Sequence, residues 1–116
     1  MKNIATGTTI PDTNCDDPGD TCSYTVADTW STDVGTSRSE WGYTLQNTNI
    51  GTSIFNYQAG YKAFGVGFAQ AQTIISNTST PSTIEIAYVC YRLTASNYQE
   101  AGNYENHLVY TATATF

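Results

Sequence analysis

The clearest alternation of hydrophobic and polar positions lies at the end of the chain, over residues 104–116. One side of the alternation is mostly apolar, and the opposite side is rich in threonine. The mostly apolar side consists of Tyr104, Asn106, Leu108, Tyr110, Ala112, Ala114 and Phe116. Because successive side chains of a strand point to opposite faces, this pattern predicts one long strand, which follows a turn at Ala101-Gly102.

A second strong pattern covers residues 83–94, where both sides of the alternation are apolar. One side carries Ile84, Ile86, Tyr88 and Cys90, and the other carries Ala87, Val89, Tyr91 and Leu93. Apolar side chains on both faces are typical of a strand that is covered from two sides. We therefore expect residues 83–94 to form a central strand.

Shorter patterns predict further strands at residues 23–27, 40–46, 52–58 and 73–75, separated by loops rich in Thr, Ser, Asn and Gly. The best of these is residues 40–46, where Trp41, Tyr43 and Leu45 share one face. No segment has the pattern of an amphipathic helix, and Gly65 and Gly67 argue against a helix between residues 61 and 76. The chain is therefore predicted to be all-β, as one antiparallel β-sandwich domain of immunoglobulin-like or pilin-like type over residues 1–116, with a loop-rich segment at residues 1–22.

The alternation also predicts the hydrophobic core. We expect the last strand to pack against the strand at residues 83–94, with Trp41 as a buried anchor. The predicted core residues are Trp41, Ile84, Ile86, Tyr88, Leu108 and Tyr110, with Tyr104 and Phe116 on the same face of the last strand.

Composition limits the function classes. At 116 residues the chain can form a single core, and its 40% hydrophobic residues exclude a disordered chain. Charged residues make up only 12%, so polar uncharged side chains keep the surface in water, as in secreted β proteins. The net charge of −6 argues against nucleic-acid binding, which needs a basic surface. No apolar run approaches the ~20 residues that span a bilayer.

The start of the sequence, Met1-Lys2-Asn3, leads directly into polar residues and has no signal peptide. We therefore expect either a leader that has been removed or an upstream portion that is missing.

Three cysteines, Cys15, Cys22 and Cys90, allow one disulfide bond and one free thiol. Cys15 and Cys22 flank a turn-rich segment, so a bridge between them closes a short loop that would stabilise the fold by no more than about 2–3 kcal/mol. A Cys22–Cys90 bridge is the second alternative. Cys90 lies on an apolar face, which favours a buried free thiol.

Two motifs together resemble a known class of domain. Trp41-Gly42-Tyr43 enters one strand, and Ala101-Gly102-Asn103-Tyr104 leads into the last one. Over about residues 39–116, and weakly at residues 8–11, this arrangement resembles bacterial cell-surface domains of the candidate phyla, in which a WGY strand is followed by a terminal strand like AGTYTNTVTYTATA. The closing pattern is also similar to the ends of spore-coat-U/fimbrial subunits and WxL domains. The resemblance implies an exported, non-catalytic surface or pilus-like module.

In that family one or two further strands precede the equivalent of Thr9-Ile10-Pro11, and here almost nothing precedes it. We therefore expect an incomplete sandwich whose open edge another chain can fill.

An acidic loop near the start of the chain is the one candidate metal site. Asp12, Asn14, Asp16 and Asp20 place oxygen ligands at alternate or near-alternate positions, as calcium loops do. The spacing resembles the start of an EF-hand loop but lacks its central glycine and closing glutamate. Acidic loops of this kind are more often solvated turns, and a calcium site is the alternative interpretation.

The sequence offers no convincing set of catalytic residues. His107 is the only histidine and lies in the middle of a predicted strand. The glutamates Glu40, Glu85, Glu100 and Glu105 form no evident acid–base pair, and the cysteine spacing has no C-x-x-C pair for zinc. We therefore expect no enzyme and no cofactor other than calcium.

Aromatic residues are the remaining candidate for binding. The residues that could stack on a sugar are Trp30, Trp41, Tyr43, Tyr57, Tyr61 and Tyr98. Aromatic residues of this kind more often belong to a core or an interface. The sequence therefore favours a secreted or cell-surface structural or adhesive module, such as a pilus- or filament-like subunit, whose partners are copies of itself or other surface proteins. The alternative is a carbohydrate- or calcium-dependent binding module.

Overall fold

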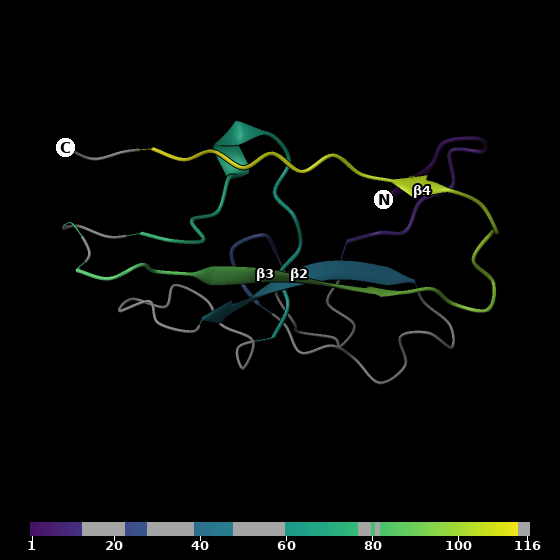
Figure 1. Ribbon diagram of the computed structural model, residues 1–116. Coiled ribbons are helices and arrows are strands. Elements are labelled where there is room, and N and C mark those ends of the chain that lie inside the picture. The colour runs from purple at the N-terminus through teal and green to yellow at the C-terminus, as the bar shows by residue number, and fades with distance from the viewer. Residues whose placement is uncertain (13–22, 28–38, 48–59, 77–79, 81, 114–116) are drawn as a thin grey trace.

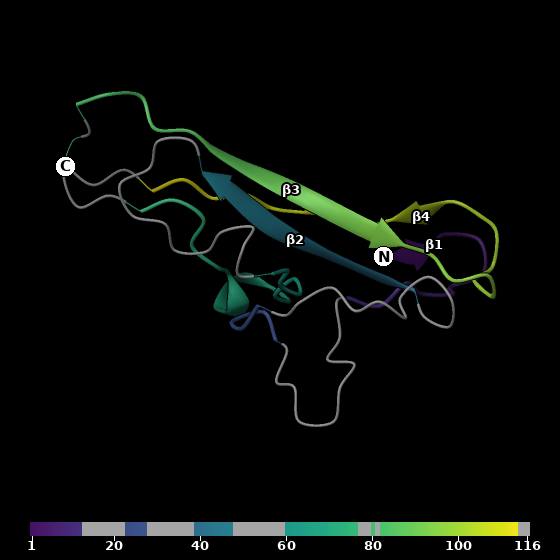
Figure 2. The same ribbon diagram turned by 90° about the horizontal axis from the view of Figure 1, so that it is seen from below.

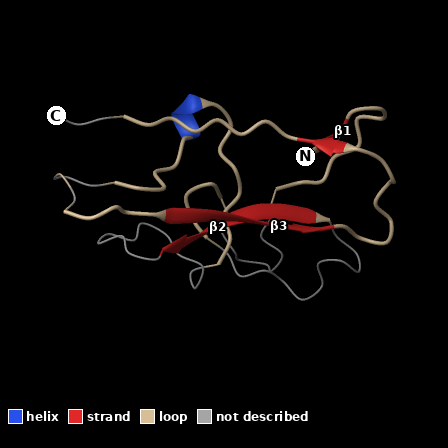
Figure 3. Ribbon diagram, viewed as in Figure 1, coloured by secondary structure: helices blue, strands red, loops and turns tan. Residues whose placement is uncertain are grey.

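The computed structural model describes residues 1–12, 23–27, 39–47, 60–76, 80 and 82–113 of the chain (Figure 1). Its elements, in order, are β1 (Lys2–Asn3), β2 (Glu40–Asn47), the 3-10 helix η2 (Phe68–Gln70), β3 (Ala87–Thr94) and β4 (Tyr104–Glu105). The strands form two separate two-stranded antiparallel sheets, β2–β3 and β1–β4. Apart from the short η2, all regular structure in the described ranges is β strand (Figure 3), which confirms the all-β prediction.

The larger sheet pairs β2 and β3 over their full lengths, from Glu40 opposite Thr94 to Asn47 opposite Ala87 (Figure 2). The predicted strand at residues 40–46 is confirmed. The predicted strand at residues 83–94 begins only at Ala87, because the ladder ends at the pair that Ala87 forms with Asn47. Residues 23–27 and 73–75 form no strand, and the predicted strand at residues 52–58 lies outside the described residues.

The second edge of β2 is also occupied. The Trp41 N–H donates to the Pro11 carbonyl at 3.1 Å, and Tyr43 exchanges two backbone hydrogen bonds with Lys62 at 2.9 and 3.1 Å. The backbone groups of Trp41 and Tyr43 therefore point away from β3. In an antiparallel ladder the opposing residues, Leu93 and Tyr91, then direct their own N–H and C=O groups toward the outer edge of β3.

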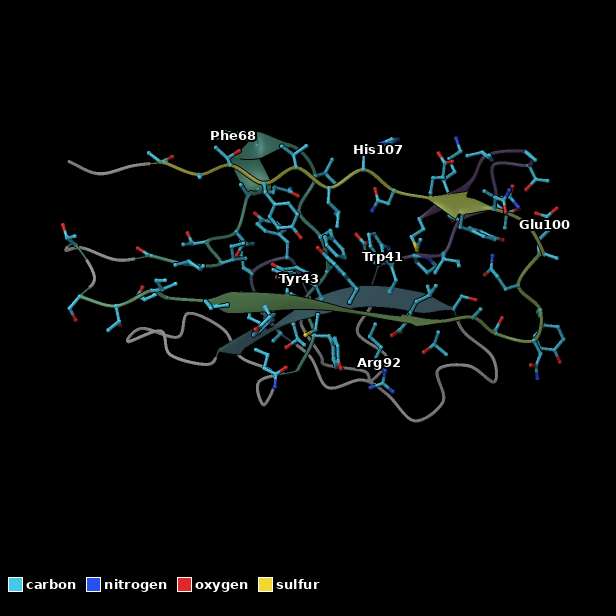
Figure 4. All side chains as sticks on the ribbon, in the orientation of Figure 1. Trp41, Tyr43, Phe68, Arg92, Glu100 and His107 are labelled. Atoms are coloured by element: carbon cyan, nitrogen blue, oxygen red, sulfur yellow. The ribbon has the colours of Figure 1, made fainter. Side chains whose placement is uncertain are left out.

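The core lies on one face of β2. Trp41, Tyr43 and Leu45 are only 5%, 7% and 1% exposed, so the predicted face of this strand is confirmed and Trp41 is a core residue. The ring of Phe64 stacks on Trp41 with centroids 4.1 Å apart and lies 4.8 Å from the ring of Tyr43. Figure 4 shows Trp41 and Tyr43 on the side of the β2–β3 sheet that faces the end of the chain, and Arg92 on the other side.

The remainder of the predicted core is wrong, because the side chains concerned are exposed. These residues are Ile84, Ile86, Tyr88, Leu108 and Tyr110. Ile84 and Ile86 precede the ladder, and Tyr88 lies opposite Gln46, on the face that Phe64 does not cover. Leu108 and Tyr110 follow β4, beyond the last residue that pairs with β1.

The first ten residues fold back on themselves as a hairpin. The Asn3 N–H donates to the Thr8 carbonyl at 2.7 Å, and the Ile10 N–H donates to the Met1 carbonyl at 2.9 Å. The side chain of Asn3, which is 1% exposed, accepts hydrogen bonds from the backbone N–H groups of Ala5 and Thr6 at 2.9 and 3.3 Å. The amide of Asn3 thus closes the turn, as asparagine side chains commonly do.

The chain bends at Gly102, where the sequence predicts a turn, and then enters β4, which pairs with β1. A hydrogen-bonded turn lies earlier, where the Gln99 N–H donates to the Ser96 carbonyl at 3.0 Å. A Cβ atom at Gly102 would lie 2.3 Å from Nδ2 of Asn3. The close approach of these two segments therefore requires glycine at this position.

The last described segment is the largest departure from the sequence prediction. Only Tyr104 and Glu105 pair in a strand, and residues 106–113 continue as an extended trace with no ladder to any described residue (Figure 1). The prediction of one long strand over residues 104–116 is therefore wrong for the described part, while residues 114–116 lie outside it. The physical reason is that, among the described residues, the partner strand β1 offers just two residues.

Candidate functional site

Only one of the four predicted calcium ligands lies among the described residues. Asp12 lies in the described part, and Asn14, Asp16 and Asp20 lie outside it. Among the described residues, no group of three or more His, Cys, Asp or Glu side chains is arranged to hold a metal ion. The calcium loop therefore stays a prediction.

Asp12 itself occupies a partly buried position beside β2, where it forms a parallel bridge with Trp41. Burial raises the pKa of the Asp12 carboxyl, and the Met1 ammonium, the Trp41 indole and the backbone of Phe64 oppose that rise. The Trp41 indole nitrogen Nε1 is buried without a hydrogen-bond partner among the described residues, although it lies close enough to this carboxyl to lower its pKa.

An open groove of about 310 Å³ lies next to Asp12. The residues around it are Met1, Lys2, Thr9, Ile10, Pro11, Asp12, Glu105 and Asn106. The lining contains no histidine, cysteine or serine that could act as a nucleophile with a base beside it. The groove therefore offers a polar surface that includes the carboxylates of Asp12 and Glu105.

The other candidate catalytic residues are dispersed. His107 is exposed on the segment after β4 and points away from the β2–β3 sheet (Figure 4). Glu40 is buried in β2, Glu85 is half-buried before β3, and Glu105 is exposed in β4. The structure therefore places these groups on different elements.

Glu100 has a structural environment that the sequence did not reveal. The hydroxyls of Thr6 and Thr8 both donate to its Oε2 atom, the first at 2.6 Å. These two hydrogen bonds lower the pKa of the Glu100 carboxyl. They connect the tip of the first hairpin to the segment before β4, across more than ninety residues of sequence, and no local pattern marks such a contact.

The three cysteines are likewise only partly described. Cys15 and Cys22 lie outside the described residues, so their pairing stays a prediction. Cys90 is a free, half-buried thiol on β3, opposite Thr44. The free-thiol interpretation of Cys90 is confirmed, and the alternative Cys22–Cys90 bridge is wrong.

The predicted sugar platform does not form from the described aromatic residues. Trp41 and Tyr43 are buried in the core, as the more common interpretation of such residues suggested. Tyr61 lies beneath the guanidinium of Arg92, whose Cζ is 5.5 Å from the ring centroid, and Tyr98 is exposed. Trp30 and Tyr57 lie outside the described residues.

A line of aromatic rings instead connects the core to the surface. Phe64, which stacks on Trp41, also lies 6.1 Å from the ring of Tyr91, and the Tyr91 hydroxyl contacts the hydroxyl of Tyr110. Burial raises the pKa of the Tyr43 hydroxyl, and the nearby Tyr110 phenol raises it further. No local sequence pattern marks the role of Phe64 or the contact between Tyr91 and Tyr110, because these residues meet only where segments far apart in the sequence cross.

Within the part of the chain that the structure describes, no helix has the length and apolar character needed to cross a membrane. Comparison with known proteins found no relative. No protein-family model, no curated protein and no solved structure matches the chain.

Proposed function

We propose that this protein is a non-catalytic structural or adhesive module of a secreted or bacterial cell-surface assembly, and that it joins neighbouring chains through strand edges. The observation that carries the proposal is the outer edge of β3. Both edges of β2 are occupied, whereas β3 pairs only with β2 among the described residues. An unpaired strand edge is a template for a strand from another chain.

The chemistry of β3 supports this role. Backbone groups of alternate residues point outward along the edge, including those of Tyr91 and Leu93, as the ladder pattern requires. The side chains of Tyr88, Tyr91 and Leu93 are each about half exposed. A second strand laid along this edge would gain backbone hydrogen bonds and cover apolar side chains at the same time.

The proposal extends to the fold, as an immunoglobulin-like or pilin-like sandwich. Both motifs of the resemblance to bacterial surface domains occupy positions that organise the structure. Trp41-Gly42-Tyr43 lies in the buried strand β2, and Gly102 makes the close turn before β4. The low content of charged residues agrees with a surface module.

A substitution at Leu93 tests the edge directly. In Leu93→Pro, the lost N–H points outward, so the ladder with β2 keeps its hydrogen bonds while the outer edge loses a donor. In Leu93→Ala, the side chain is shortened even further than in Leu93→Pro, but the N–H remains. We expect the wild-type protein to self-associate with rising concentration in light scattering, Leu93→Ala to retain most of that association, and Leu93→Pro to lose it.

Three results would count against the proposal. A wild-type protein that stays monomeric at all accessible concentrations and does not bind other surface-protein chains would contradict it. Equal association of the two Leu93 variants would show that the contact does not use this edge. Association that requires calcium and is abolished by EDTA would support the calcium-dependent alternative instead.

A further inference from the structure

The contact between Tyr91 and Tyr110 joins two segments that lie 19 residues apart in the sequence. Tyr91 belongs to β3, and Tyr110 belongs to the extended segment after β4. Their hydroxyl groups touch, and the two side chains are 49% and 59% exposed. Two phenols are thus held together at a surface that a dissolved reagent can reach.

Neighbouring rings hold this pair in place. Phe64 stacks beside Tyr91 at an interplanar angle of 22°, and Phe64 is itself stacked on the buried Trp41 at 4.1 Å. Tyr110 lies close enough to Tyr43 to affect the ionisation of its hydroxyl. The Tyr91 ring is therefore supported by the core, and Tyr110 lies over the same cluster.

We propose that Tyr91 and Tyr110 are a site of oxidative modification, at which a peroxidase acting with hydrogen peroxide forms an intramolecular dityrosine cross-link. Each phenol loses one electron and one proton to give a phenoxyl radical, and the two radicals join through a carbon–carbon bond between ring carbons next to the hydroxyls. Proton shifts then restore both phenols. The pair loses two hydrogen atoms in total, and one hydrogen peroxide is reduced to two molecules of water.

Proximity is the reason for the selectivity. The chain has nine tyrosines, but holding two reacting groups in contact makes their coupling effectively unimolecular. Tyr98, by contrast, is the more exposed side chain at 87%, and no ring contact with another described aromatic residue is recorded for it. If exposure alone decided the site of coupling, Tyr98 would react first. Contact between the two phenols instead favours coupling of Tyr91 with Tyr110.

The cross-link would have a structural consequence that does not depend on assembly through β3. The segment after β4 is attached to the described part of the molecule by a two-residue ladder and a few side-chain contacts. A covalent bond from Tyr110 to β3 would hold this segment in place. It would also restrict the unfolded chain, so the melting temperature of the oxidised protein should rise.

The experiment uses the full chain in dilute solution, treated with a haem peroxidase and hydrogen peroxide. Dityrosine fluorescence, the intact mass of the monomeric fraction and a peptide map locate the bond. Tyr110→Phe removes one reacting phenol while preserving the ring, and Tyr98→Phe is the matched control at a more exposed tyrosine. Free tyrosine oxidised in parallel shows that the reagent is active.

We expect the wild-type monomer to lose the mass of two hydrogen atoms and to yield one linked peptide pair containing Tyr91 and Tyr110. Tyr98→Phe should behave in the same way, and Tyr110→Phe and Tyr91→Phe should each lose most of the monomeric dityrosine signal. A wild-type monomer without dityrosine, or a bond that joins other tyrosines, would overturn the proposal. An undiminished dityrosine signal in both Tyr91→Phe and Tyr110→Phe would overturn it as well. Thermal melting of the unoxidised variants separates loss of the site from loss of the fold.

Discussion

Two segments of this chain carry similar alternation but have different environments. In β2, the apolar residues Trp41, Tyr43 and Leu45 are almost completely buried. In the segment after β4, Leu108 and Tyr110 alternate in the same way and remain exposed. The difference lies in the neighbours, because β2 pairs with β3 on one edge and with Pro11 and Lys62 on the other.

The same contrast occurs across a single ladder. Tyr43 and Tyr91 face each other from β2 and β3 and share a face, yet Tyr43 is 7% exposed and Tyr91 is 49% exposed. Ala27 and Ile74 pack against the cluster of Tyr43 and Leu45, in addition to Phe64, which contacts both Tyr43 and Tyr91. Periodicity therefore assigns a side chain to a face, and burial requires a second segment that covers that face.

Hydrogen exchange gives the largest expected difference between the two segments. The amides of β2 should open only with global unfolding, at about 5 kcal/mol or more. The amides of residues 108–111 have no recorded backbone partner among the described residues and should exchange with an opening free energy close to zero. Mass spectrometry at peptide resolution measures the exchange of both segments. Equal protection of β2 and residues 108–111 would contradict the predicted difference.

Truncation at the centre of β2 should give the next largest effect. Trp41→Ala removes a ring that is 5% exposed and stacked on Phe64, so we expect the free energy of unfolding to fall by about 3–5 kcal/mol. The matched variant on the terminal segment, Val109→Ala, removes a side chain that is 89% exposed and should change stability by no more than ~0.5 kcal/mol. Urea denaturation checks both, and similar losses for the two variants would contradict the assignment of the core.

The smallest expected effect concerns Asp12, which lies at the edge of β2. Burial raises the pKa of its carboxyl above 3.8, so the folded protein binds more protons than the unfolded chain just above that pH. Stability should therefore fall as the pH rises from below 3.8 through the pKa of the folded state. Asp12→Asn lacks the titrating carboxyl and therefore this loss of stability. The stability of the variant relative to the wild type should increase as the pH rises over the same range.

Glu100 supplies a control of opposite sign. Hydrogen bonds from Thr6 and Thr8 lower the pKa of its carboxyl below 4.5, so its contribution to stability is present above 4.5 and is lost as the pH falls through the lowered value. The stability of Glu100→Gln relative to the wild type should therefore decrease as the pH rises. Thermal melts of both variants across the acidic range measure the two trends, and trends of the same sign would refute the Asp12 assignment.

Several features followed from local sequence alone. The all-β class follows from period-two alternation, and the buried face of β2 follows from the spacing of Trp41, Tyr43 and Leu45. The turn at Ala101-Gly102 was also predicted, and the structure adds the reason: a side chain at Gly102 would collide with Asn3. These properties depend on residues that are adjacent in the chain, so their pattern is readable without knowledge of the fold.

Other features were decided only by the meeting of distant segments. Alternation in residues 104–116 predicted a long buried strand, but the partner β1 is two residues long, and only β4 forms in the described part. The contacts of Glu100 with Thr6 and Thr8, and of Tyr110 with Tyr91, depend on how loops bring chain segments together. The sequence by itself determined which residues share a face and where the chain turns. Tertiary structure alone decided which faces are covered, because burial and pairing depend on the supply of neighbours from elsewhere in the chain.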